Sequence, residues 1–362
     1  AFMKKGIVLT NLATNTFEAS NLLPDIVYGM MTNEVWGAGK TLGAQQVDRD
    51  QMIIASNFCN AMGFTWDGVV GDRINFRQWV FEQAQFCLLD ATVIGGKFAL
   101  KPAVPILSDF KIGNNVFPDI RALFTDGNMK DMQVTWLSPE ERQLFTAEVL
   151  WREDTVNGFP KTRQFTLRYS DAEGGSVTDP VETFDMSAFC TSQEHATRFA
   201  QYALGVRKHV DHAIRFNTTP QAAMALTPGD YFQVSSEAAH TNRFNNGSIN
   251  SEGFITSNDP IPDGPVSIYY WRQGTEGIGG TTIQVSDGRC TDVAFHNIVF
   301  TRVMLVTESR VYKLESLTYA EEGLVEVSGS HMPLTAAGTL AILDWNPNYY
   351  NPPTPGALPS YF

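Results

Sequence analysis

Apolar residues recur every three or four positions in three stretches of the first hundred residues, which is the spacing of an amphipathic helix. The three stretches cover residues 22–30, 48–62 and 75–88. Pro24 suits the first turn of the first helix, and Gly63 stands where the second helix should end. We therefore predict three helices in this part of the chain.

A hairpin is predicted directly after the third helix. Residues 92–94 and 97–101 have strand character, and the Gly-Gly pair between them suits a two-residue turn. Together with the three helices, this hairpin predicts a small α+β domain over residues 20–107. Residues 1–19 before it are expected to be an extended lead-in.

From Pro105 onward apolar residues alternate with polar ones, which is typical of strands with one buried face. The alternating stretches are 132–136, 145–151, 165–169, 214–216 and 231–234. One helix interrupts them at residues 191–206, where Thr191 and Glu194 have the spacing of a capping box. The pattern predicts a β domain over residues 108–240 that carries a single helix.

The last third of the chain begins with residues 241–264, which are rich in Asn, Ser, Gly and Asp and predict a loop. Five further strands are expected at 266–271, 281–286, 293–306, 310–319 and 324–329. We place them in a β segment, residues 265–345, that completes the preceding β domain. The proline-rich residues 346–362 should be extended. The whole chain is thus predicted to be α+β and mainly β.

The composition favours a protein that works through its surfaces. Of 362 residues 43% are hydrophobic and only 18% are charged, and a surface poor in charge is typical of a chain that buries area against partners. The formal charge is 26 − 39 = −13, which argues against binding nucleic-acid phosphates. Such acidity can form a wall that DNA slides past, or it can simply keep the chain soluble. No apolar run reaches the ~18 residues of a membrane-spanning helix.

The cysteines do not form a recognisable redox or zinc motif. They are Cys59, Cys87, Cys190 and Cys290, and no two of them have CxxC spacing. Cys59 and Cys87 lie among apolar residues on helical patterns, so we expect them to be buried free thiols.

Residues 37–41, Gly-Ala-Gly-Lys-Thr, look like the end of a phosphate-binding loop. That motif needs a glycine where Glu34 stands, and it should follow a buried strand, whereas residues 30–32 have the pattern of a helix end. We therefore predict no nucleotide site here. The glycine-rich residues 274–280 predict a hairpin loop, because no helix follows them.

Residues for acid–base or metal chemistry are few. His209 and His212 flank Asp211, but on a strand the two imidazoles would point to opposite faces, so we expect a surface pair and no joint metal ligation. His195 is expected to face solvent. The chain has no HExxH and no GxSxG motif. We predict no catalytic, cofactor-binding or metal-binding residue, and a protein that is not an enzyme.

Three segments resemble one known family, and they occur in the family's order. Residues 185–234 read as a polar helix with an Arg near its end, a strand ending in Phe-Asn-Thr, an Ala-Leu segment, and Pro-Gly-Asp before a strand. Residues 25–39 read as a helix, an Asn, an aromatic residue and Gly-x-Gly, and residues 312–327 read as a closing hairpin. This order resembles the tail tip attachment (host-specificity) and baseplate hub proteins of tailed phages. Trp36 departs from the family, which usually has Tyr there.

The resemblance covers residues 20–240 and 309–330 and implies a structural virion protein. It implies a homotrimeric hub at the tail tip or baseplate, with tube-like antiparallel β-barrel or sandwich domains around the tail axis. Its implied partners are the distal tail protein or tail tube protein on one side and a spike or fibre protein on the other. DNA would pass through the channel without specific binding. The family's C-terminal receptor-binding parts have no counterpart, so we expect a hub or the hub portion of a longer protein.

Two alternatives stay open. A receptor- or glycan-binding tail fibre module would use Tyr269, Tyr270 and Trp271 beside the loop at residues 272–281. Binding of the isolated chain to a glycan array would favour this alternative. A cell-wall hydrolase would clear a peptidoglycan suspension, and we expect no clearing.

Overall fold

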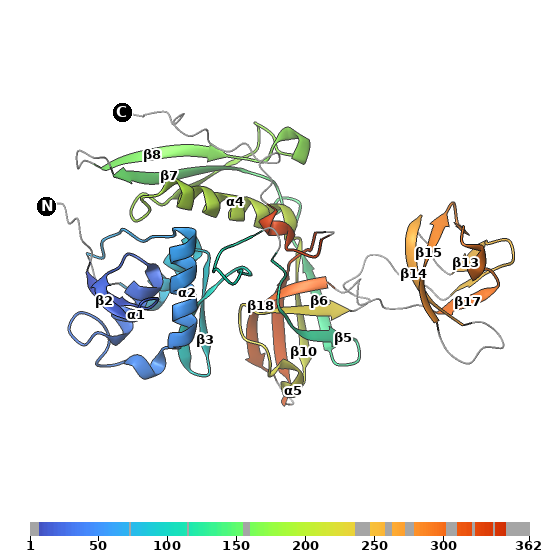
Figure 1. The fold of residues 1–362 in the computed structure, drawn as a ribbon, viewed down its shortest axis with the longest axis horizontal. Coiled ribbons are helices and arrows are strands. Elements are labelled where there is room, and N and C mark those ends of the chain that lie inside the picture. Colours follow the sequence, from blue (N-terminus) through green and yellow to red (C-terminus); the bar gives the residue numbers. More distant parts are fainter. Residues whose placement is uncertain are drawn as a thin grey trace.

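The computed structural model describes residues 7–71, 74–113, 116–154, 160–235, 247–257, 263–271, 279–301, 310–320, 323–335 and 337–344. These residues form a main body and a smaller β unit that lies apart from it (Figure 1). The tail expected at residues 346–362 lies outside the described residues, as does most of the glycine-rich loop at residues 274–280.

The N-terminal unit consists of two hairpins and three helices. Its elements are β1 (Val8–Asn11), β2 (Thr16–Ala19), α1 (Leu23–Thr32), η1 (Ala44–Gln46), α2 (Arg49–Met62), α3 (Phe76–Phe86), β3 (Leu89–Ile94) and β4 (Lys97–Pro102). The three predicted helices and the predicted Gly-Gly hairpin are confirmed. The Asp48 carboxylate caps α2 by accepting from the Gln51 amide at 3.2 Å, and Gly63 ends it with a left-handed φ of 68°.

The first described residues form a packed hairpin, and the expectation of an extended lead-in is wrong for them. β1 and β2 pair antiparallel, and Leu9 and Leu12 are buried. The Asn11 side chain closes the turn by accepting from the amides two and three residues on, at 3.0 and 3.2 Å. The buried Asp25 carboxylate of α1 fixes the hairpin by accepting from the Leu12 amide at 3.2 Å.

A six-stranded sheet forms the centre of the main body. In spatial order its strands are β5 (Ile120–Thr125), β11 (Tyr231–Ser235), β18 (Arg310–Tyr319), β19 (Val325–His331), β10 (His212–Thr218) and β6 (Lys130–Trp136). β5 and β11 run parallel, and the other neighbours run antiparallel. The short helix α5 (Pro220–Ala223) follows β10. The core of this sheet includes Phe124, Phe216, Phe232, Tyr312 and Val327.

A three-stranded sheet and the long helix α4 (Gln193–His209) lie beside the N-terminal unit (Figure 1). The strands, in spatial order, are β8 (Pro160–Leu167), β7 (Thr146–Asp154) and β9 (Val181–Asp185), and η2 (Asp171–Glu173) precedes β9. The predicted helix is confirmed, but its predicted cap is wrong. Ser192 caps α4 by accepting from the His195 amide at 3.3 Å, because the Thr191 hydroxyl donates instead to Asp67 at 2.7 Å.

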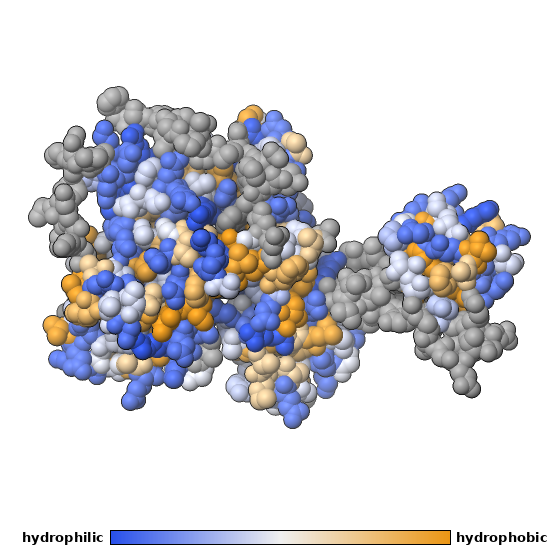
Figure 2. Space-filling view, in the orientation of Figure 1, coloured by the Kyte–Doolittle hydropathy of each residue, from blue (hydrophilic) through white to orange (hydrophobic). Residues whose placement is uncertain are grey.

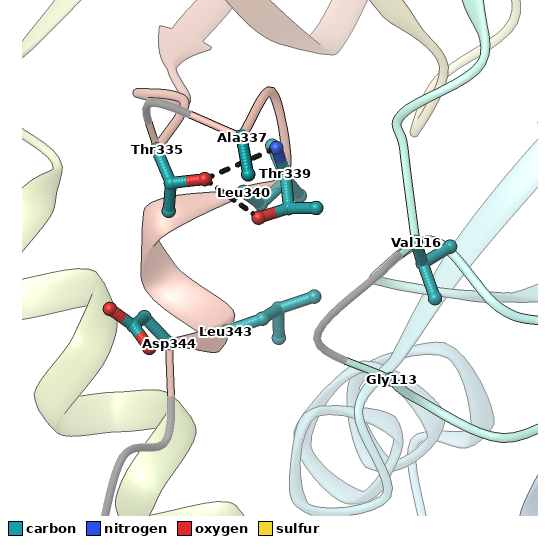
Figure 3. A pocket seen from close by; sticks show the side chains of 8 residues that line it. All are labelled: Gly113, Val116, Thr335, Ala337, Thr339, Leu340, Leu343 and Asp344. Carbon is teal, nitrogen blue, oxygen red and sulfur yellow. Dashed lines mark hydrogen bonds between the residues drawn. The ribbon is translucent and has the colours of Figure 1, made fainter.

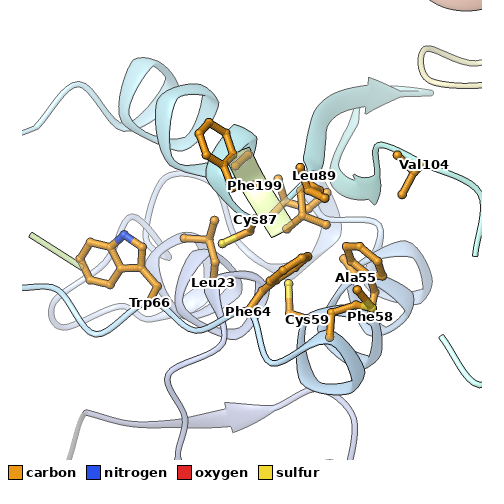
Figure 4. Close-up of a cluster of buried hydrophobic side chains, with 14 of the residues drawn as sticks. Leu23, Ala55, Phe58, Cys59, Phe64, Trp66, Cys87, Leu89, Val104 and Phe199 are labelled. Carbon is orange, nitrogen blue, oxygen red and sulfur yellow. The ribbon is translucent and has the colours of Figure 1, made fainter. Parts of the chain in front are cut away.

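One hydrophobic core joins the N-terminal unit to α4 and the three-stranded sheet. In Figure 4 Phe199 of α4 belongs to the same cluster as Phe64, Cys87 and Leu89. The ring of Phe199 lies 5.0 Å from that of Phe86, centroid to centroid. These segments are therefore one packed body, although more than a hundred residues separate Phe86 and Phe199 in the chain.

The smaller β unit contains a second six-stranded sheet with its own core. In spatial order its strands are β13 (Ile255–Ser257), β12 (Gly247–Ile249), β17 (Ile298–Thr301), β14 (Gly264–Trp271), β15 (Gly279–Ser286) and β16 (Arg289–Cys290). A short turn, η4 (Val293–Phe295), precedes β17. Two strands lie within the expected loop at residues 241–264, and the expected segment 265–345 is divided between this sheet and β18 and β19 of the main sheet.

The α+β, mainly β class is confirmed. The barrel form is not present in the described residues, because β5 and β6 are the edges of the main sheet and β13 and β16 those of the second. Within the same residues, no helix is both long and apolar enough to cross a membrane.

Candidate functional site

The surface of the main body carries many large apolar side chains. Figure 2 shows them gathered over the N-terminal unit and along the main sheet. Those more than half exposed in these parts include Phe17, Val35, Val69, Val93, Phe117, Met224 and Tyr319. Exposed apolar area of this kind is typical of surfaces that bind other proteins. The surface, and not a cleft, is therefore the first candidate for function.

The phosphate-loop look-alike at residues 37–41 terminates α1. The Ala38 amide donates to the Met30 carbonyl at 2.7 Å, and the Gly39 amide donates to the Asn33 carbonyl at 3.0 Å. A Cβ on Gly37 or Gly39 would overlap with carbonyl oxygens at the end of α1, so the close packing of the turn requires glycine at both places. Amides used in this way cannot also bind a phosphate.

A polar cluster lies on the main sheet, where a row of aromatic side chains crosses four strands. The register pairs Trp136 of β6 with His212 of β10, and Tyr312 of β18 with His331 of β19. The imidazole rings of His212 and His331 stack with centroids 4.4 Å apart, and the Trp136 ring lies 4.4 Å from that of His212.

Asp211 joins the two imidazoles. Its Oδ1 lies 2.7 Å from Nδ1 of His212 and 2.6 Å from Nδ1 of His331. The Nε2 of His212 lies 2.9 Å from the Tyr312 hydroxyl. His212 is fully buried, so the expected surface pair with His209 is wrong. His212 is buried because the cross-strand register places its side chain between the rings of Trp136 and His331.

Burial lowers the pKa of His331 to about 4 and also lowers the pKa of His212. Burial alone would raise the pKa of Asp211, but the hydrogen bonds from His331 and His212 lower it. At neutral pH the cluster is thus one carboxylate that accepts from two neutral imidazoles. Within the described residues, Asp211, His212 and His331 are also the one group whose side-chain atoms lie close enough together to hold a metal ion.

A third histidine, His195, is buried among thiols. His195 was expected to face solvent, but it is fully buried, its ring 4.7 Å from that of Phe64 and its Nε2 2.9 Å from the Phe86 carbonyl. Burial lowers the pKa of His195, but the neighbouring sulfurs of Cys190 and Cys87 raise it to about 10. A thiol beside an imidazole can form a nucleophile in other proteins. Here neither Cys87 nor His195 is exposed to solvent, so a substrate cannot reach them.

A cavity of about 200 Å³ lies between Thr335, Ala337 and Thr339, the following η7 (Ala341–Leu343), and the pair Gly113 and Val116 (Figure 3). The Thr335 and Thr339 hydroxyls are hydrogen-bonded to each other at 2.8 Å across the turn. Among the described residues of the lining, Asp344 is the single ionisable one. One carboxylate beside aliphatic walls provides no acid–base pair for catalysis.

Of the three aromatic residues considered for glycan binding, the structure describes the side chain of Tyr270. It is half-buried, and its ring packs against Phe295 with centroids 5.4 Å apart. The side chains of Tyr269 and Trp271 and the loop at residues 272–278 lie outside the described residues. The described part of this region is therefore a packed sheet face.

No protein-family model and no curated protein sequence matches this chain. Among solved structures, it is similar to a chain of the virion of a native gene transfer agent particle, with 10% identity and a TM-score of 0.36, covering 78% of this chain and 47% of that one. It is similar to the tail protein from Neisseria meningitidis MC58, with 8% identity and a TM-score of 0.32, covering 73% and 56%. It is also similar to the 43 kDa tail protein of prophage MuSo2 from Shewanella oneidensis, with 9% identity and a TM-score of 0.30, covering 72% and 56%.

This chain spans about half the length of the solved chains that it matches.

Proposed function

We propose that this chain is a structural protein of a phage-type tail, located in the virion, and that it forms the hub at the tail tip or baseplate. It acts through its surfaces as a homotrimer and is not an enzyme. Its partners are the distal tail protein or tail tube protein and a spike or fibre protein. Its excess carboxylates face the channel through which DNA passes.

The observation that carries this proposal is where the family-like segments lie in the fold. Residues 185–234 supply β10 and nearly all of β11. Residues 312–327 supply most of β18 and residues 325–327 of β19. These four strands are consecutive in the main sheet, in the order β11-β18-β19-β10. Two of the three segments that resemble the family are thus distant in sequence but form one continuous structural unit, and the third, residues 25–39, lies in the N-terminal unit.

The surface chemistry also supports an assembly role. The chain combines 18% charged residues with a net charge of −13 and many exposed apolar side chains. Apolar side chains such as Val35 and Tyr319, 92% and 88% exposed, are suited to subunit contacts. Excess carboxylates are suited to a channel wall, because DNA is repelled from them and finds no resting place there.

The test is to find the chain in particles and to count its copies. Antibody against the chain, applied to negatively stained particles, should label one end of the tail. Light scattering of the purified chain should give the mass of a trimer, three times 40.1 kDa. Label on the capsid or along the whole tube, or a strictly monomeric chain, would contradict the hub.

The glycan-binding alternative is favoured by one observation, the separate β unit of residues 247–301. It has its own core, with Ile249, Ile283 and Phe300 buried, and it lies apart from the main body (Figure 1). A module placed in this way is accessible to a ligand. Retention of the whole chain on a glycan array, lost when residues 247–301 are replaced by a short Gly-Ser linker, would support this alternative over the hub.

A further inference from the structure

We propose that Asp211, His212 and His331 form a site for a divalent transition-metal ion, with Zn²⁺ as the ion that their chemistry fits best. The three candidate ligand atoms lie within 4.8 Å of one another. Both Nδ1 atoms face the same carboxylate oxygen, at 2.7 and 2.6 Å. The three donors therefore converge from three side chains.

The three side chains must rearrange to hold the ion, because their ligand atoms lie within 4.8 Å of one another and the Asp211 oxygen now contacts both imidazoles. Zn²⁺ binds nitrogen at about 2.0–2.1 Å and carboxylate oxygen at about 2.0–2.2 Å, so donors around a tetrahedral ion lie about 3.3 Å apart. The Asp211 oxygen would have to move away from each imidazole by about 0.6 Å to reach that separation. Asp211 can do this because its side chain is 23% exposed and lies at the edge of the cluster. The same exposed edge gives an ion a path from solvent.

The surroundings of His212 resemble those of a metal-binding histidine. When one imidazole nitrogen binds a metal, the other carries a proton and is usually held by a hydrogen-bond acceptor. The Tyr312 hydroxyl is in that place, 2.9 Å from Nε2 of His212. Tyr312 is itself fully buried, and the Trp136 ring covers the imidazole. His212 therefore has a fixed orientation with Nδ1 directed at Asp211.

The donor set selects among metals. Two imidazoles and one carboxylate suit Zn²⁺, Co²⁺, Ni²⁺ and Cu²⁺, whereas Ca²⁺ and Mg²⁺ prefer oxygen ligands alone. Three protein ligands leave one position of a tetrahedral ion for water. The positive charges of Arg310 and Arg142 lower the pKa of His212, and the same charges disfavour binding of a cation beside it. We therefore expect an ion that exchanges with chelators and not one that is held permanently.

The ion would clamp the main sheet. His212 is the first residue of β10, Asp211 directly precedes it, and His331 is the last residue of the adjacent strand β19. A metal bound to all three stabilises this corner because it binds the folded arrangement and not the unfolded chain. This inference concerns the sheet alone and does not depend on the hub proposal.

The experiment measures zinc and cobalt binding to the full chain after treatment with EDTA and its removal. Equilibrium dialysis against ZnCl₂, with metal analysis, should give one ion per chain, and the thermal midpoint should rise with zinc. Added Co²⁺ should show visible d–d absorption that zinc abolishes. Asp211→Asn and His331→Gln should each lose stoichiometric binding. His209→Ala, which changes a nearby histidine outside the cluster, should bind like the unchanged chain.

Tyr312→Phe gives a graded check that does not remove a ligand. Losing the group that orients His212 should weaken zinc binding by about 10- to 100-fold. The far-UV circular dichroism of each variant verifies that it is folded. Absence of stoichiometric zinc in the unchanged chain would overturn the proposal. So would equal binding by the Asp211→Asn and His331→Gln variants, because the metal would then lie elsewhere.

Discussion

The ammonium of Lys313 lies 2.6 Å from the carboxylate of Asp90, and this ion pair joins β18 of the main sheet to β3 of the N-terminal unit. Lys313 also donates to the Ala103 carbonyl at 2.9 Å, and the Tyr231 hydroxyl donates to the same oxygen at 3.3 Å. Burial alone would lower the pKa of Lys313, but Asp90 raises it above its ordinary value. The junction between the two units is therefore charged and only partly accessible to water.

Asp90→Ala should destabilise the chain by about 2–3 kcal/mol. Removing one partner of a buried pair leaves an uncompensated charge and costs about 3–5 kcal/mol, and we expect less here because the Asp90 side chain is 31% exposed. The control is Asp109→Ala, whose ion pair with Lys111 is more than half exposed on both sides and should contribute under about 0.5 kcal/mol. Urea denaturation measures the free energy of unfolding of both variants. Equal destabilisation by Asp90→Ala and Asp109→Ala would contradict a role for burial.

Gly205→Ala should destabilise the chain, although alanine normally favours a helix by about 1 kcal/mol over glycine. A Cβ on Gly205 of α4 would overlap with the Ile342 carbonyl oxygen of η7. Forcing these segments apart should cost about 1–3 kcal/mol. Gly71→Ala is the control, since a Cβ there meets no atom within 4 Å. A thermal midpoint raised by Gly205→Ala would show that the contact does not constrain α4.

Local chemistry made the helices and hairpins predictable. Asp48 and Gly63 mark both ends of α2 within the chain itself, and the Gly-Gly pair determines the turn between β3 and β4. The cap of α4 was misplaced by one residue, because Thr191 has a distant partner in Asp67 that the sequence does not reveal. The order of the strands could not be predicted from local sequence patterns. β11 and β18 are neighbours in the main sheet, but the strands of the second sheet lie between them in the sequence.

The polar clusters were missed for the same reason. His212 and His331 are 119 positions apart in the sequence numbering and meet only because β10 and β19 pair. His195 lies on the first turn of α4, where its place directly after the expected capping residue Glu194 suggested solvent, but that turn is covered by Phe64 and Phe86 of the N-terminal unit. One sequence feature could have indicated the Asp211 cluster. The chain has only six histidines, and one of them, His212, directly follows an aspartate.

Phe199→Ala should cost about 3–5 kcal/mol, since it removes a buried ring and leaves a cavity. The ring is 8% exposed and lies 5.0 Å from Phe86 and 5.3 Å from Phe184 between centroids. Ser192→Ala, which removes the helix cap, should cost only about 1 kcal/mol. Met224→Ala, at a side chain 83% exposed, should change stability by less than about 0.5 kcal/mol. The expectation fails if Phe199→Ala leaves the melting temperature unchanged.

Ionisation of Asp25 should lower the free energy of unfolding as the pH rises above about 4, the ordinary pKa of a carboxyl group. Burial raises the pKa of Asp25 above that value, so the folded chain keeps the proton to a higher pH than the unfolded chain does. Ionisation then favours the unfolded state in this window, because the unfolded chain releases its proton first. Asp25→Asn lacks the ionisable group, so its stability relative to the unchanged chain should increase between pH 4 and pH 6. Urea denaturation at both pH values gives this difference, and a constant or falling difference would contradict the assignment.

Assembly of the proposed trimer should persist, or strengthen, as salt is added. Each subunit carries 39 acidic and 26 basic residues, so subunits repel one another at low ionic strength. Salt shortens the screening length from about 10 Å at 0.1 M to about 3 Å at 1 M, which weakens this repulsion. Contacts made by apolar side chains are not screened and remain. Light scattering over roughly 0.05 to 1 M NaCl, the range over which the screening length changes most, should show a constant or rising trimer fraction. Dissociation on adding salt would mean that ion pairs hold the subunits together, and the acidic balance would then have no role at the interface beyond solubility.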